Sequence, residues 1–232
     1  MAAAKPLKPV PLLRAGEATA FPRFPPRLQP RRIRAGVIRV STPSTCGGGP
    51  DELPAALLPN ARRRRHGGGF SLGVDLGSTR TGIAVGRGIT LPRPLTVLKL
   101  RGQRLELMLL DIAQKQEADE LIVGLPVSAD GSETAQSNKV RSVVGRLAVQ
   151  AADRGLRVYL QDEHGTSIDA LEFMISSGVK RSARDVKSDA YSAMMILERY
   201  FSSSGQGAKI VLPRQSELHV KLLAQSRKDA EI

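Results

Sequence analysis

The stretch Gly73-Val74-Asp75-Leu76-Gly77 decides the fold class of this 232-residue chain. It belongs to a short apolar run, Phe70–Leu76, that stops at a glycine, which is typical of a buried strand. Two more apolar runs, Thr81–Val85 and Leu95–Leu100, follow after glycine- and proline-marked turns. The three runs predict an antiparallel meander that opens the domain.

Helical and strand patterns then alternate along the chain. This order predicts an α/β domain with a five-stranded mixed sheet, three antiparallel strands followed by parallel ones, flanked by helices. The predicted elements are a helix around Leu105–Ala113, a strand at Leu121–Val123, a helix over Glu133–Arg154, a strand at Leu156–Leu160 and two helices, Ser167–Ser176 and about Val186–Phe201.

Three acidic residues occupy unusual places in this predicted frame. Asp75 lies inside an apolar strand, where a carboxylate is costly unless it is paired or metal-bound. Glu163 directly follows the fifth strand, and ligands of open α/β sheets gather outside the carboxyl ends of strands. Asp189 is expected to open the last helix. Each acid also has a structural interpretation, as a turn cap, a solvated loop residue or a first-turn acid favoured by the helix dipole.

A metal site here would have to be built from carboxylates. The chain has one cysteine, Cys46, and three scattered histidines, which excludes an intramolecular disulfide and a cysteine-rich zinc site. Carboxylate oxygens select hard cations, so the expected cofactor is Mg²⁺ or Mn²⁺. Two such ions can hold the attacking and leaving oxygens of a phosphodiester. No apolar run approaches the ~18 residues of a membrane helix, so no membrane partner is expected.

The net charge of +13 is concentrated in the N-terminal part of the chain. Residues 1–68 hold 13 of the 35 Lys/Arg and 3 of the 22 Asp/Glu, which leaves 22 and 19 for the remainder. Such an arginine-rich, acid-poor, hydroxyl-bearing segment predicts a disordered transit peptide, for the chloroplast or alternatively the mitochondrion. A basic RNA-binding arm is the other interpretation of this segment. The expected division is therefore a leader at 1–68, a domain at 69–204 and a polar tail at 205–232.

Four ordered motifs resemble one known family. They are Gly73-Val74-Asp75-Leu76-Gly77 with Gly82-Ile83-Ala84-Val85, Ile122-Val123-Gly124-Leu125-Pro126 with Asp130-Gly131-Ser132-Glu133, Asp162-Glu163 with Thr166-Ser167, and Ser188-Asp189-Ala190 with Ile196-Leu197. Over about residues 70–204 the chain resembles the YqgF (RuvX) family of pre-16S rRNA nucleases, which are related to Holliday-junction resolvases.

The resemblance implies a fold, an activity and a ligand set. The fold is ribonuclease H-like, and the activity is metal-dependent phosphodiester hydrolysis in maturing the 5′ end of small-subunit ribosomal RNA. Asp75, Glu163 and Asp189 are the implied catalytic metal ligands. The partner is then a nucleic acid, either pre-rRNA or branched DNA.

One position departs from the family pattern. The family usually has Arg-Leu after the Asp-Glu pair, whereas this chain has His164-Gly165. Histidine is mostly neutral at pH 7 and lacks the permanent planar charge of arginine. The candidate substrate-binding residues are Arg80, Ser132, His164 and Lys187.

Two other functional classes remain open. A module of the same fold could bind RNA or act in transcription without catalysis, which the His164-Gly165 change favours and the three retained acids oppose. The stretch Asp75–Gly82 also resembles the phosphate-binding hairpin of sugar kinases and actin-like ATPases. Those proteins need a second comparable domain, for which this chain has too few residues after the leader.

Overall fold

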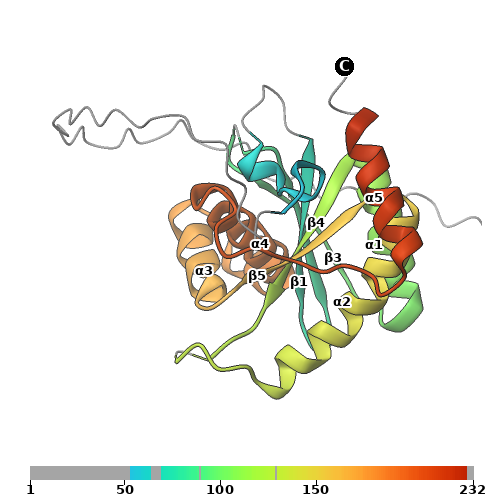
Figure 1. Ribbon diagram of the computed structural model, residues 1–232. Coiled ribbons are helices and arrows are strands. Elements are labelled where there is room, and N and C mark those ends of the chain that lie inside the picture. The colour runs from blue at the N-terminus through green and yellow to red at the C-terminus, as the bar shows by residue number, and fades with distance from the viewer. Residues whose placement is uncertain (1–52, 64–68, 89, 129, 229–232) are drawn as a thin grey trace, which may run out of the picture. The chain divides into compact units, whose positions relative to one another are not determined.

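The computed structural model describes residues 53–63, 69–88, 90–128 and 130–228, with side chains up to residue 224 (Figure 1). The proposed transit peptide therefore lies almost wholly outside the described residues. No helix in these described ranges is long and apolar enough to cross a membrane.

A mixed sheet of six strands forms the centre of the domain, in the order β3-β2-β1-β4-β5-β6. The β1–β2 and β2–β3 pairs are antiparallel, and β1–β4 and β4–β5 are parallel. This arrangement confirms the ribonuclease H-like fold and the predicted order of strand directions. The sixth strand was not predicted, because it has only two residues. The strands are β1 Phe70–Leu76, β2 Thr81–Gly86, β3 Arg93–Leu98, β4 Ala118–Leu125, β5 Arg157–Asp162 and β6 Lys209–Ile210.

Helices cover both faces of the sheet (Figure 1). In the figure α1, α2 and α5 lie on one side of the strands, and α3 and α4 lie on the other. The strand side chains alternate between these two layers because successive residues of a strand point to opposite faces. The helices are α1 Gly102–Lys115, α2 Ala135–Asp153, α3 Thr166–Ser176, α4 Arg181–Ser202 and α5 Ser216–Lys228.

The larger core lies between the sheet and the α1–α2 layer. Leu72, Val74 and Leu76 of β1 are buried there with Leu109 of α1 and Val144 of α2. The intervening β1 residue Asp75 therefore faces the other layer, which contains α4.

Glycines allow α4 to lie unusually close to the sheet. A β-carbon on Gly73 would lie 2.7 Å from the carbonyl oxygen of Ala193, and one on Gly82 would lie 1.8 Å from that of Asp189. Both carbonyls belong to the backbone of α4, so only residues without a side chain fit beneath this helix. The close approach brings acidic residues of α4 and β1 together.

The packed structure begins before the predicted boundary at residue 69. Two short 3₁₀ helices, Ala55–Leu57 and Asn60–Arg62, precede β1, and Leu57 and Asn60 are buried. The assignment of all of residues 1–68 to a disordered leader is therefore wrong for residues 53–63. Neither turn has helical or strand periodicity, which is why the sequence pattern did not reveal them.

Asn60 joins a buried polar network at the amino end of β4. Its backbone N–H donates to Glu120 Oε2 at 3.0 Å, and Arg157 donates to its side-chain oxygen at 2.6 Å. Glu120 Oε1 also accepts hydrogen bonds from Ser71 and Tyr200. Burial raises the pKa of Glu120 to about 7, although these hydrogen bonds act in the opposite direction.

Residues beyond 204 also belong to the packed domain. β6 pairs antiparallel with β5, and Leu222 of α5 is buried with Leu57 and Ala152. The polar tail after residue 204 thus contains a further helix, α5, that packs on the domain.

Candidate functional site

Asp75 lies near the carboxyl end of β1, between β2 and β4, and faces α4. Its partner across the antiparallel pair is Gly82. Burial raises the pKa of Asp75 to about 7, and the nearby Asp189 contributes in the same direction. The carboxyl group therefore lies where a negative charge is poorly solvated and has a second acid beside it.

Asp189 lies in the third turn of α4, not at the start of the helix as predicted. The helix begins at Arg181. Its first turns are polar and exposed, so they lie before the apolar periodicity from which a start near Val186 was predicted. An N-terminal dipole role for Asp189 is thereby excluded. Instead, Arg80 Nε lies 2.7 Å from Asp189 Oδ2, and Arg80 also donates to the carbonyl of Asp185.

Glu163 directly follows β5, and its side chain turns back over β4. A β-carbon on Gly124 would lie 1.9 Å from Glu163 Oε2, so the glycine provides the space for this carboxylate. The pKa of Glu163 is raised to about 8, mainly by burial and to a smaller extent by the charges of Asp75 and Asp162. The electrostatic influence of Asp75 indicates that the two acids share one region of the sheet face.

The donor set is suited to a hard cation. All three side chains offer carboxylate oxygens; Glu163 Oε2 is buried without a hydrogen-bond donor, whereas Asp189 Oδ2 is paired with the Arg80 guanidinium. In the described part of the chain, however, no group of three His, Cys, Asp or Glu side chains is gathered closely enough to hold an ion. The chemistry thus fits Mg²⁺ or Mn²⁺, while Arg80 rather than a metal is the present partner of Asp189.

The other predicted substrate-binding residues lie on three different segments. His164 is exposed, its backbone N–H donates to Asp162, and its Nδ1 lies 3.3 Å from the carbonyl oxygen of Val127. Ser132 lies in an exposed turn where it donates to Asp130. Lys187 precedes Asp189 by two residues on α4 and is half-buried.

The N-cap of α2 is Thr134, which follows the Asp130–Glu133 motif and forms a capping box with Ser137. The backbone N–H of Thr134 donates to Ser137 Oγ at 2.8 Å. Ser132 is thus free of the capping role and stays within the turn before the helix.

A family model described as "RuvX: Holliday junction resolvase" matches residues 69–203. The chain belongs to the RuvX family. A Rickettsia felis protein named "Putative pre-16S rRNA nuclease" is 35% identical over 155 residues, covering 66% of this chain and 93% of that protein. A Cronobacter sakazakii protein of the same name is 32% identical and is covered over 99% of its length.

Solved structures give a more distant likeness. A structure titled "T. thermophilus RuvC in complex with Holliday junction substrate" has 20% sequence identity and a TM-score of 0.42, over 61% of this chain and 98% of that chain.

At His164-Gly165, where the chain departs from the usual RuvX pattern, the backbone adopts a conformation that favours glycine. Gly165 has a φ of 77°, in the left-handed region that favours glycine, and it forms the N-cap of α3. Arg199 of α4 donates to the carbonyl of His164 at 2.7 Å and lies 3.3 Å from Asp169. A permanent cation therefore contacts this loop from α4 instead of from the position after Glu163.

Sequence reasoning missed Arg199 and also Arg101, which lines a pocket on the opposite face of the sheet. Neither residue lies in the four motifs quoted above, and each is one of 35 Lys/Arg in the chain. Only the fold shows that Arg199, on the helix of Asp189, reaches the loop after Glu163.

Proposed function

We propose that this chain is a Mg²⁺- or Mn²⁺-dependent nuclease that hydrolyses phosphodiester bonds during 5′-end maturation of small-subunit pre-rRNA in an organelle. The observation that carries the proposal is the placing of Asp75, Glu163 and Asp189 on one face of the sheet. One of their carboxylate oxygens, Glu163 Oε2, is buried and has no hydrogen-bond donor. The choice of pre-rRNA as the substrate is taken from the names of the RuvX relatives.

The three acids would hold the cation in this proposal. When bound, it would supply Lewis-acid polarisation of a phosphoryl oxygen and charge stabilisation in the transition state. Asp75 and Glu163 would contribute negative charge that burial makes unfavourable without a cation. With the cation held by Asp189, the Arg80 guanidinium would no longer pair with that carboxylate. Arg80 would then be able to neutralise a non-bridging phosphate oxygen of the substrate.

The test is a cleavage assay of the full chain with a pre-rRNA fragment and with branched DNA. Each substrate is incubated with Mg²⁺, with Mn²⁺ and with a chelator. Asp75→Asn, Glu163→Gln and Asp189→Asn should each reduce cleavage at least ~100-fold, since each removes a charge on which metal binding depends. Exposed Glu172 on α3 gives the matched control, Glu172→Gln, which should leave cleavage unchanged. Near-normal turnover in two of the three site variants would refute the assignment.

One observation favours a second candidate, a non-catalytic nucleic-acid-binding module. The Arg80–Asp189 ion pair occupies one of the proposed ligands. Under this alternative, parent and Asp75→Asn proteins would bind the RNA equally well, and neither would cleave it with either metal. Cleavage by the parent protein alone rejects the alternative.

The organellar part of the proposal rests on the composition of residues 1–52, which lie outside the described residues. Fusing these residues to a fluorescent reporter in plant cells should direct it to chloroplasts. Mitochondrial fluorescence would change the compartment, and cytosolic fluorescence would favour the RNA-binding arm.

A further inference from the structure

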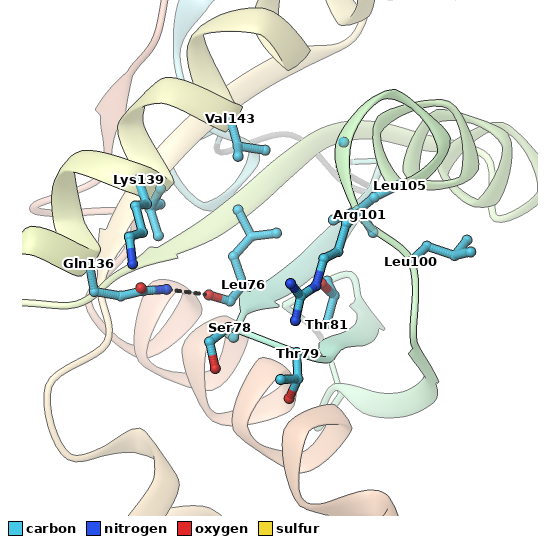
Figure 2. A pocket seen from close by; sticks show the side chains of 13 residues that line it. Leu76, Ser78, Thr79, Thr81, Leu100, Arg101, Leu105, Gln136, Lys139 and Val143 are labelled. Carbon is cyan, nitrogen blue, oxygen red and sulfur yellow. Dashed lines mark hydrogen bonds between the residues drawn. The ribbon is translucent and has the colours of Figure 1, made fainter.

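A pocket of about 300 Å³ lies at the end of the β1–β2 hairpin, on the face of the sheet opposite Asp75. Figure 2 shows its lining side chains, which come from the hairpin, from the start of α1 and from α2. The inner wall is apolar and includes Leu76, Leu105 and Val140. The rim is polar, so the pocket combines an apolar floor with several hydrogen-bonding groups.

Two cationic side chains reach into this pocket from different helices. Arg101 and Lys139 are both exposed, and among the described residues neither makes an ion pair or a hydrogen bond. Figure 2 shows their charged ends directed toward the turn that contains Ser78 and Thr79. No acidic residue lines the pocket. The local charge is therefore positive and is not neutralised by the protein itself.

Hydrogen-bond donors add to this charge. The hydroxyls of Ser78 and Thr79 lie on an exposed turn and make no hydrogen bond to other described residues. The helix α1 starts at Gly102 with no side-chain cap and no acidic residue in its first turn, so its first N–H groups keep their partial positive charge. A β-carbon on Gly102 would meet nothing within 4 Å, which leaves its backbone open to a ligand.

We propose that this pocket binds a phosphate ester of a nucleic acid strand, at a subsite separate from the carboxylates. Two unpaired cations, two free hydroxyls and an uncapped helix start together match the charge and acceptor oxygens of a phosphate. None of the lining residues is aromatic, so base stacking is absent and recognition is directed to phosphate and sugar. The phosphate is either a terminal monoester or an internal diester.

The position of the pocket links it to the proposed nuclease function, on which this inference rests. Asp75 and Leu76 are consecutive residues of β1 and therefore point to opposite faces of the sheet. Asp75 belongs to the carboxylate group, and Leu76 lines the pocket. A strand crossing the tip of the hairpin would contact both sites. The subsite would then hold the substrate in register without reading its sequence.

Binding rather than cleavage tests the subsite, so that the two proposals can fail separately. The full chain is titrated in low salt and chelator with inorganic phosphate, a nucleoside 5′-monophosphate, and short single-stranded RNA bearing either a 5′-phosphate or a 5′-hydroxyl. Arg101→Gln with Lys139→Gln should raise the dissociation constant for the nucleotide and RNA at least tenfold. Lys115→Gln with Arg214→Gln, an equal loss of charge at exposed residues outside the pocket, should change it less than twofold.

The outcomes separate the phosphate sources. Tighter binding of RNA with a 5′-phosphate than of RNA with a 5′-hydroxyl assigns the pocket to a terminal monoester, and equal binding assigns it to an internal diester. In the parent protein, amide NMR shifts on adding the nucleotide should centre on Ser78, Thr79 and Gly102. Asp75→Asn should bind the nucleotide like the parent even if it cleaves nothing. Thermal melting first checks that both double variants are folded. If both then bind the nucleotide and RNA equally weakly, or if neither binds them more weakly than the parent, the subsite assignment is wrong.

Discussion

Asp75 and Glu163 retain their protons to higher pH than ordinary carboxylic acids. Burial, together with a smaller contribution from neighbouring carboxylates, raises their pKa values to about 7 and about 8. The folded protein therefore binds these protons more tightly than the unfolded chain does. Their contribution to the free energy of unfolding is complete below pH ~4 and is lost as pH rises through 7 and 8.

We therefore expect the metal-free protein to lose several kcal/mol of unfolding free energy between pH 5 and pH 9. Urea unfolding at each pH measures it. The Asp75→Asn/Glu163→Gln double variant should keep only the smaller dependence due to buried Glu120. Adding Mg²⁺ at pH 9 should restore stability to the parent and not to the double variant. An unfolding free energy that is constant or increases over this range would contradict the pKa shifts.

In the proposed metal site, Arg80 would compete with the cation for Asp189. Because Arg80 Nε lies 2.7 Å from Asp189 Oδ2, a cation bound to that oxygen would displace the guanidinium. Arg80→Gln should therefore tighten Mn²⁺ binding by about threefold to tenfold, a modest gain because this ion pair is partly exposed. Isothermal titration with Mn²⁺ measures the change, with Arg214→Gln as the control. Weaker metal binding in Arg80→Gln would show that Arg80 instead orients Asp189.

At the level of elements, the approach of α4 to the sheet depends on glycines that differ in what they face. A β-carbon on Gly82 would overlap the backbone oxygen of Asp189, which cannot move without shifting α4. A β-carbon on Gly124 would instead meet the ends of two side chains, Glu163 and Ile196. The same substitution should therefore have different consequences at these two positions.

Gly82→Ala should destabilise the protein by about 3 kcal/mol or more, because the overlap is with backbone. Gly124→Ala should cost about 1–2 kcal/mol and yet remove most nuclease activity, since it displaces the Glu163 carboxylate. Thermal unfolding and cleavage assays on both variants separate the effects. Gly145→Ala, at an α2 position with open space around it, is the control that should be neutral or slightly stabilising. Equal stability and activity losses in both variants would contradict this division.

At the level of the whole molecule, the segment before β1 contributes to stability. Starting the chain at Leu53 should preserve the melting temperature of the parent. Starting it at Gly69 should lower it by roughly 10 °C, because burial of Leu57 is lost and Glu120 and Arg157 lose Asn60 as a partner. Differential scanning calorimetry on the two truncations measures the difference. Equal melting temperatures would return residues 53–63 to the leader.

The sequence predicted most of the central fold because apolar periodicity marks it. Five strands and the helices α1 to α4 were predicted close to their observed positions. The two-residue β6 and the 3₁₀ turns before β1 were not, since neither is long enough to show a period. The motifs indicated the three acids, but the Arg80–Asp189 pair joins residues 109 positions apart and could not be predicted without the fold.

The contact between Leu57 and Leu222 has a consequence for the timing of folding. Leu57 is synthesised early, and its partner on α5 is among the last described residues of the chain. During synthesis the sheet can form while Leu57 still lacks part of its final contact surface. The segment that contains Leu57 therefore completes its packing last. If the proposed transit peptide precedes it, a processing protease would find this segment accessible until α5 has docked.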